Sequence, residues 1–366
     1  MNLNYHKMKF LRLAFYVLIA QLVLSGCAGE AVEETSSSSS SEINFDAYVG
    51  RNASTRSSET NIDFLKGNAF NAGFGVFARY NYNGKILSLL DTEHVTWNKD
   101  QNHWEYTNTR FWPSEGSVDF YAFAPYSDQP KMENFAIDFP ANWSPVDLVY
   151  ANAEGKTKAD NPVKFTFRHA LARLSFEITA NPKIEEKDVV IKVKEVKLYG
   201  ADETSGIFLM GGYLNLKTGG WKPYPNGFSW FYTWTPNGIV EDKGNVENGK
   251  KDENSIIYKL SEHPQLDHTN DKITNAADSY IYIIPQPKPA NFNLKITYTV
   301  QQGGFEETVK VYKNLLDVLP GNRDPYFEGG KAYVFHFKLS LDPVKFDVKT
   351  TVGNWIGNEV KDEITI

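Results

Sequence analysis

Apolar and polar residues alternate with a period of two along several segments of this 366-residue chain. In 292–300 (FNLKITYTV) every even position is apolar and every position between is polar, and 333–341 and 344–349 follow the same rule. This is the pattern of a β-strand with one buried face. No stretch keeps an apolar period of 3.6 residues over three turns, so the helical crossovers of a parallel sheet are missing. The sequence predicts an all-β fold of antiparallel sheets packed as sandwiches.

Two segments change the phase of this alternation. In 191–198 (IKVKEVKL) the apolar residues move from odd to even positions, and in 165–178 (FTFRHALARLSFEI) they do so near residues 169–172. A β-bulge produces such a shift, and so does a strand that crosses from one sheet to another. Either explanation fits both segments.

The length of the chain suits about two domains of ordinary size. A stretch rich in Gly, Lys and Asn at 152–162 marks the expected boundary, which gives an N-terminal β-sandwich domain over 43–161 and a C-terminal one over 162–366. Residues 27–42 include an acidic segment and six consecutive serines. They hold almost nothing apolar and therefore predict a flexible tether.

The first 26 residues predict a signal peptide. Basic residues precede an apolar run at 13–24, which is too short to span a bilayer as a helix, since that takes ~20 residues. The run ends in LSGC at 24–27, which resembles the signal of bacterial lipoproteins. The resemblance implies cleavage before Cys27, lipid attached to its sulfur, and an anchor in the outer membrane. An ordinary secretory signal is the alternative, and translation starts at Met1 or Met8.

Charge and motifs exclude several classes of function. Without residues 1–26, Lys plus Arg falls from 38 to 35 against 45 acidic residues, and the net charge of −10 disfavours a nucleic-acid partner. Residues 244–251 (GNVENGKK) approach a P-loop but end in Lys251, where Ser or Thr should hold Mg²⁺, so a hydrophilic hairpin is expected. His263 and His268 have no third metal ligand nearby in the sequence. We therefore expect no catalytic residues, no cofactor and no metal site.

Tryptophans suggest one function. Indole rings that face solvent stack on sugars, and Trp221 and Trp230 are the weak candidates for such a ligand site. Most of the eight tryptophans are expected to pack in the core or against loops instead. A monomeric surface lipoprotein that binds glycans or host proteins through aromatic loops is thus one candidate.

Several motifs, taken in order, resemble the fimbrillin family of Bacteroidetes, whose members build type V pili. The similar segments are FWP (111–113), VDFYAFAPY (118–126), DLVYA (147–151), FTFRHALARL (165–174), YIIPQ (282–286), KAY (331–333) and GNW (353–355). The resemblance covers the chain from residue 43 to residue 366. It implies two transthyretin-like β-sandwich domains in tandem, and it makes a pilus subunit used in adhesion the first hypothesis.

The resemblance also implies assembly by strand exchange with other pilus subunits. In the family a trypsin-like protease cuts after an arginine near the start of the first domain. Arg56 is the favoured position here and Arg51 the second, and both lie in a run of small polar residues where a scissile bond is accessible. Before the cut we expect a lipid-anchored protein on the cell surface. After it we expect the protein in the fimbrium, and its place as shaft, tip or anchor stays open.

The strand removed by that cut would be 43–49 (INFDAYV), with Ile43, Phe45, Ala47 and Val49 on its apolar face. Its removal would leave an apolar groove that a strand of another subunit fills.

The candidate donor strand in this chain is 360–366 (VKDEITI), through Val360, Ile364 and Ile366. Asp362 falls on the same face, so this segment can equally complete its own domain.

Overall fold

The alternating segments form β-strands throughout the part of the chain that the computed structural model describes. These residues are 41–50, 60–139, 147–180, 190–209, 211–224, 281–318, 326–339, 347–356 and 359–365, and between 229 and 273 only the strands named below. The chain from Ser41 to Ile366 is one compact unit.

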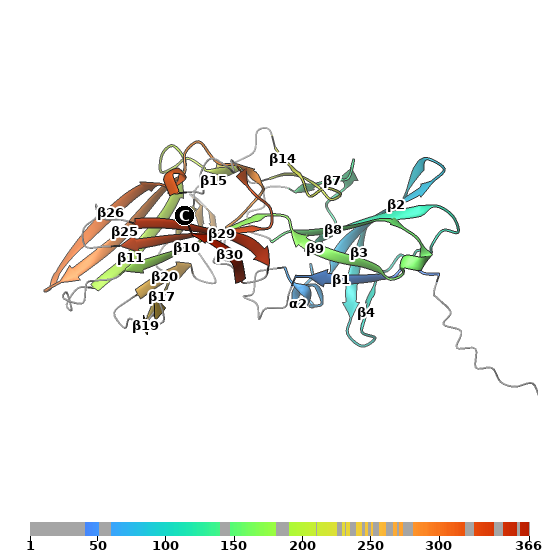
Figure 1. The fold of residues 1–366 in the computed structure, drawn as a ribbon, viewed down its shortest axis with the longest axis horizontal. Coiled ribbons are helices and arrows are strands. Elements are labelled where there is room, and N and C mark those ends of the chain that lie inside the picture. The colour runs from blue at the N-terminus through green and yellow to red at the C-terminus, as the bar shows by residue number, and fades with distance from the viewer. Residues whose placement is uncertain are drawn as a thin grey trace, which may run out of the picture. The chain divides into compact units, whose positions relative to one another are not determined.

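Seven strands form one sheet, called the N-terminal sheet, in the order β1-β9-β8-β5-β2-β3-β4 (Figure 1). They are β1 (Phe45–Val49), β2 (Phe74–Tyr82), β3 (Lys85–Asn98), β4 (His103–Glu105), β5 (Ser117–Ala124), β8 (Val149–Lys156) and β9 (Val163–His169). Alternation decides which face is buried: in β9, Val163, Phe165 and Phe167 are buried and the residues between them are exposed. Asn83 and Gly84 close the β2–β3 hairpin, both with positive φ, as a tight hairpin turn requires.

A one-turn helix, α2 (Ile62–Leu65), and a 3-10 turn, η1 (Lys158–Asp160), accompany this sheet. Asn61 caps α2, since its side-chain oxygen accepts a hydrogen bond from the Phe64 N–H at 2.8 Å. Leu65 is the buried residue of this helix, and it joins the core of the N-terminal sheet.

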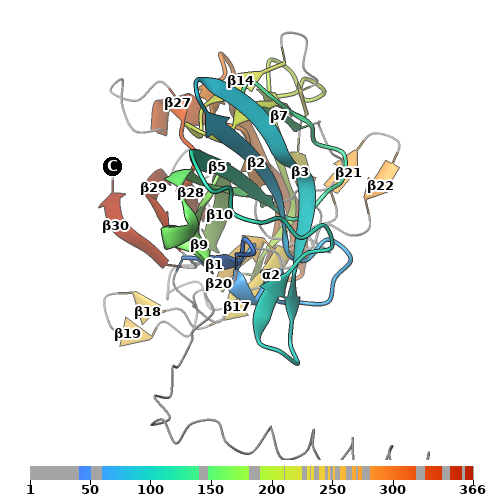
Figure 2. The same ribbon diagram turned by 90° about the vertical axis from the view of Figure 1, so that its right-hand side faces the viewer.

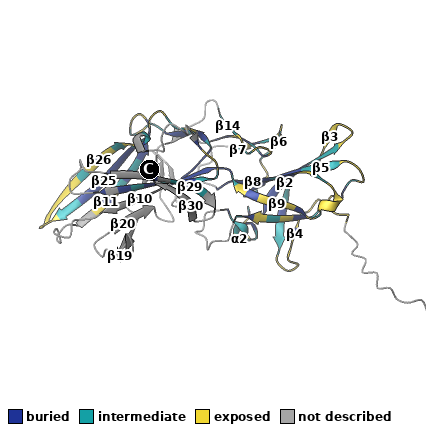
Figure 3. Cartoon of the chain, viewed as in Figure 1, coloured by how far each residue is buried: buried dark blue, intermediate teal, exposed yellow. Residues whose placement is uncertain are grey.

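Two further sheets share a second core, to which Leu174, Val196, Ile296 and Phe335 contribute. One has the order β17-β20-β10-β28-β29-β30, with β23 also paired to β10, and the other has the order β16-β11-β25-β26. Their strands are β10 (Ala172–Ala180), β11 (Val190–Tyr199), β16 (Tyr232–Trp234), β17 (Ile239–Lys243), β20 (Ile256–Leu260), β23 (Ile281–Ile283), β25 (Asn293–Gln302), β26 (Phe305–Asn314), β28 (Lys331–Leu339), β29 (Asp347–Ile356) and β30 (Glu359–Thr365). The edge strand β26 is mostly exposed (Figure 3).

Smaller sheets complete the described fold. The order β14-β13-β7-β6 joins β6 (Met132–Glu133), β7 (Ala136–Phe139), β13 (Gly212–Asn215) and β14 (Trp221–Pro223). The remaining pairs are β12 (Phe208–Leu209) with β15 (Ser229–Trp230), β18 (Val246–Glu247) with β19 (Lys250–Lys251), β21 (Leu266–His268) with β22 (Asp271–Ile273), and β24 (Gln286–Pro287) with β27 (Tyr326–Phe327). A 3-10 turn, η3 (Leu315–Val318), follows β26.

Both changes of phase in the sequence have a structural counterpart, and each takes a different one of the two expected forms. The chain leaves the N-terminal sheet at the end of β9 and enters the sheet of β28 as β10, so the shift near residues 169–172 is a crossing between sheets. In β11 the pairing with β25 shifts between Val193 and Glu195, which is a β-bulge at Lys194.

The predicted all-β class is confirmed, and antiparallel pairs dominate. Among the described strands two pairs are parallel, β1 with β9 and β10 with β28. The tandem transthyretin-like arrangement and the boundary at residue 161 stay predictions. β9 follows that boundary but belongs to the N-terminal sheet, and β7 pairs with β13 across it.

Candidate functional site

β1 occupies one edge of the N-terminal sheet and pairs with β9 alone (Figure 1 and Figure 2). Ile43, Phe45 and Val49 are buried, and Ala47 packs half-buried against the same core. Tyr48, which points to the other face, is 52% exposed. The predicted displaced strand therefore has one face in the core and one in solvent.

Phe45 lies in a ring of aromatic side chains. Its ring centroid is 5.3 Å from that of Tyr106, 5.7 Å from Phe165, 5.8 Å from Phe120 and 6.4 Å from Phe74. We call these four residues the Phe45 box. Three of them, Phe74, Phe120 and Phe165, are almost completely buried. Aromatic pairs at these distances add to the hydrophobic gain of burial, so Phe45 is a principal side-chain anchor of β1.

The main chain that leads into β1 is held by the side chain of Asn161. The Asn44 N–H donates to Asn161 Oδ1 at 2.9 Å, and Asn161 Nδ2 donates to the carbonyl oxygen of Glu42 at 3.1 Å. One amide group thus serves an N–H and a C=O two residues apart. The Val163 N–H donates to the Asn44 carbonyl at 2.8 Å and continues the contact into β9.

Tyr106 holds the same segment from the other side. Its hydroxyl donates to the Ile43 carbonyl at 2.9 Å and accepts from the Arg110 N–H at 3.1 Å. Burial raises the pKa of Tyr106, and the Arg110 N–H partly opposes this effect. The phenol therefore stays protonated and able to donate through the physiological range.

The predicted processing segment begins directly after β1. Gly50 follows the strand with a φ of +49°, and both Arg51 and Arg56 lie outside the described residues. The chain is described again at Thr60, whose N–H donates to Asp147 Oδ2 at 2.8 Å. Asp147 is buried and also contacts His169 Nδ1 through Oδ1 at 2.9 Å. Both candidate arginines thus lie between two anchored points, β1 and Thr60.

The candidate donor segment forms β30, the edge strand of its sheet. Val360 is paired with Trp355 and Ile364 with Val352, both on β29. Ile366 lies outside the described residues. In this structure the segment completes its own sheet.

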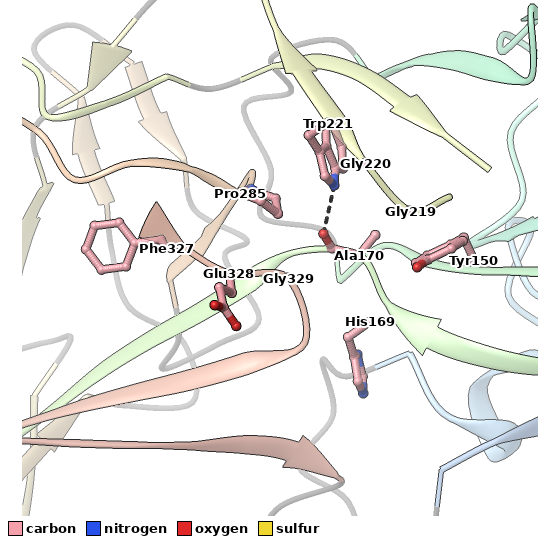
Figure 4. A pocket seen from close by; sticks show the side chains of 10 residues that line it. All are labelled: Tyr150, His169, Ala170, Gly219, Gly220, Trp221, Pro285, Phe327, Glu328 and Gly329. Carbon is pink, nitrogen blue, oxygen red and sulfur yellow. Dashed lines mark hydrogen bonds between the residues drawn. The ribbon is translucent and has the colours of Figure 1, made fainter. Parts of the chain in front are cut away.

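Trp221 lines a pocket of about 340 Å³ together with Tyr150, His169 and Glu328 (Figure 4). Its Nε1 donates to the Ala170 carbonyl at 2.8 Å, and its ring meets Phe139 edge to face. The indole is therefore fixed by packing while it borders the pocket. The backbone of Trp230 pairs with Phe208 in a different small sheet.

Other sequence candidates for chemistry are not gathered into a site. The stretch 244–251 contains the β18–β19 pair, and the strand β20 follows it instead of the helix that a P-loop needs. The described residues hold no group of three His, Cys, Asp or Glu side chains that could bind a metal ion. Among the same residues, no helix has the length and apolar character needed to cross a bilayer. Cys27 and the predicted signal peptide lie outside them.

A family model described as fimbrillin-like matches residues 55–355. The chain belongs to the fimbrillin-like family. This confirms the resemblance found in its motifs.

Solved structures agree on the fold. A fimbrial protein from Bacteroides vulgatus is 20% identical, with a TM-score of 0.59 over 86% of this fimbrillin-like chain and 99% of that one. A candidate cell adhesion protein from Bacteroides uniformis is 16% identical, with a TM-score of 0.49 over 86% and 99% of the two chains. A search of curated proteins found no match.

Sequence reasoning missed three residues that hold the β1 region of this fimbrillin-like chain. Asn161 looked like part of a domain boundary, Tyr106 was noted only within a family motif, and Asp147 only as the start of DLVYA. A polar residue next to an apolar strand is the only local hint of such roles. Each contact joins residues far apart in the sequence: Asn161 and Asn44 are separated by 117 positions.

Proposed function

We propose that this chain is a structural subunit of a cell-surface pilus, exported as an outer-membrane lipoprotein and assembled by strand exchange. Membership of the fimbrillin-like family supports the general role. The observation that carries the mechanism is the position of β1: a short edge strand, apolar on one face, directly followed by the segment that holds Arg51 and Arg56.

Cleavage after either arginine would turn β1 into a separate peptide held only by non-covalent contacts. Its loss would expose the Phe45 box and the unpaired edge of β9. An open, apolar strand edge is a template for pairing with another chain. A strand from a second subunit would restore both the ladder hydrogen bonds and the buried side chains.

The same cut decides where the protein resides. Cys27, the proposed lipid attachment site, lies N-terminal to both arginines. An uncut chain would stay anchored in the outer membrane, whereas a cut chain would be released from its lipid and enter the fimbrium. The candidate donor face of Val360, Ile364 and Ile366 would serve a neighbouring subunit only if β30 left β29.

The mature N-terminus tests this proposal directly. Protein from the native host is analysed by mass spectrometry, and gels of unheated samples are examined for SDS-resistant ladders. We expect an N-terminus at Ser57, or at Asn52 if Arg51 is used, and ladders that disappear in a chain with both arginines changed to Ala. A lipid-bearing Cys27 terminus on every molecule, with no ladder and no copurifying subunit, would count against assembly.

The pocket beside Trp221 supports a second candidate, a surface lipoprotein that binds glycans. An indole beside a polar pocket can stack on a sugar while Glu328, His169 or Tyr150 contacts its hydroxyl groups. A glycan array with the wild type, Trp221→Ala and Trp230→Ala tests it. Binding lost in the Trp221 variant while its thermal stability is retained supports this candidate, and no binding by the wild type removes it.

A further inference from the structure

The groove under β1 has unequal subsites for side chains, and this bears on which strand can replace β1. Phe45 sits among the four rings of the Phe45 box. The subsite of Ile43 is completely closed to solvent, and that of Val49 nearly so. Ala47, opposite Phe165 in the ladder, is only half-buried. The groove therefore has one large aromatic subsite with a small, more open subsite beside it.

The main-chain contacts set the register of any occupant without regard to its sequence. Asn161 binds the N–H of residue 44 and the C=O of residue 42, and the Tyr106 hydroxyl binds the C=O of residue 43. Any extended chain offers these groups at the same spacing. Selection among strands is therefore left to the side chains, chiefly the one that enters the Phe45 box.

The candidate donor strand of this chain fits these subsites poorly. With its apolar face inward, Asp362 can occupy the subsite of residue 43, 45, 47 or 49. Three of these subsites are buried, and burial of an unpaired carboxylate is strongly unfavourable. Only the subsite of Ala47 is partly open. That register puts Val360 in the Phe45 box, where a valine leaves much of the space of a phenyl ring empty.

We infer that the groove selects a donor strand with an aromatic residue at the position of Phe45, and so prefers a strand of a different subunit to the 360–366 segment of a second copy. This inference rests on the proposed function, since it requires that β1 be replaced. It adds the chemistry of the partner: an extended strand with an aromatic side chain, followed two residues later by a small one.

Peptide exchange tests the inference on the full chain. A recognition sequence for a site-specific protease replaces residues 51–56, the protein is cut, and a fluorescent peptide is added in excess. The peptides are INFDAYV (43–49), its Phe45→Ala and Tyr48→Ala variants, NEVKDEITI (358–366) and its Val360→Phe variant. Tyr48→Ala is the matched control, because it also removes an aromatic ring but on the exposed face. Anisotropy gives the affinity, and mass spectrometry records release of the original β1.

We expect the Phe45→Ala peptide to bind roughly a hundredfold more weakly than INFDAYV, as a lost buried ring implies, and Tyr48→Ala within about threefold of it. NEVKDEITI should bind weakly, and Val360→Phe should improve it by roughly tenfold or more.

Two results would overturn the inference and leave strand exchange standing: equal binding of the Phe45→Ala and native peptides, or equal binding of NEVKDEITI and INFDAYV. If β1 stays in place and no peptide enters, including the native one, the inference and the proposed function both fail.

Discussion

Asn161 shows how a single side chain can stand in for a strand. The chain before β1 has no neighbouring strand to pair with Glu42 and Asn44 on the β9 side, and the carboxamide of Asn161 supplies one acceptor and one donor there. Asparagine suits this role because its amide has the same two groups as a peptide bond. The contact is independent of the sequence that it binds.

Asn161→Ala should therefore loosen β1 without changing its buried face. Loss of two partly buried hydrogen bonds is expected to lower the free energy of opening of β1 by about 1–3 kcal/mol. Hydrogen exchange at the Asn44 amide measures this directly. Asn44→Ala is the control, because its side chain makes only an exposed 3.3 Å bond to Glu42, and it should change stability by less than about 0.5 kcal/mol. Equal protection of β1 in the Asn161 variant and the wild type would contradict this role.

Tyr106 makes the anchoring of β1 sensitive to alkaline pH. Its pKa is raised above the ordinary value of 10.0, chiefly by burial, so the folded state favours the neutral phenol. The stabilisation is full below pH 10 and is lost as the pH rises through the folded pKa. Tyr106→Phe should cost about 0.5–1.5 kcal/mol at neutral pH. The difference in urea midpoint between the two proteins should then narrow above pH 10, and parallel curves from pH 8 to 11 would rule this out.

At the scale of elements, the passage from β9 to β10 organises the fold. His169 ends a strand of the N-terminal sheet, and Ala172 starts a strand of another sheet three positions later. The Ala170 N–H donates to the Leu148 carbonyl, and Leu171 accepts from the Gly330 N–H. These bonds hold the short connection against both sheets, which explains why its apolar residues change phase.

Asp147 ties three elements together next to this connection. Its carboxylate serves the Thr60 N–H before α2 and the His169 ring at the end of β9, while its own position starts the approach to β8. Asp147→Asn keeps the shape but loses the charge and one acceptor, and we expect it to destabilise the protein by about 1–3 kcal/mol. Chemical denaturation measures the loss. Asp100→Asn, at an exposed turn, should have almost no effect, and equal losses in both variants would show that Asp147 has no special role.

For the whole molecule, the proposed lipid and the proposed cut are in competition. In detergent phase partition, we expect the uncut chain in the detergent phase and the processed chain in the aqueous phase, because the cut separates Cys27 from the folded body. Cys27→Ser should move the uncut chain to the aqueous phase. Arg51→Ala with Arg56→Ala should keep all of the protein in the detergent phase. A processed body that still partitions with detergent would contradict this picture.

The sequence by itself determined the secondary structure class, because period-two alternation is a local property that survives in any register. It correctly predicted the strands β25 and β28, and it located the two irregularities at residues 169–172 and 191–198. It also predicted which residues of β1 face inward, since parity alone separates Phe45 from Tyr48. The P-loop-like stretch was correctly expected to form a hairpin.

Only the tertiary structure decided which irregularity was a bulge and which a crossing, because that depends on the neighbouring strand and not on the pattern. It also decided that β1 lies at an edge, parallel to a strand more than a hundred positions away, and that four rings from distant segments meet around Phe45. Contacts such as those of Asn161 and Asp147 leave no local trace. "LSGC" still names a lipid address in the sequence alone, whereas the structure supplies the strand whose removal would detach it.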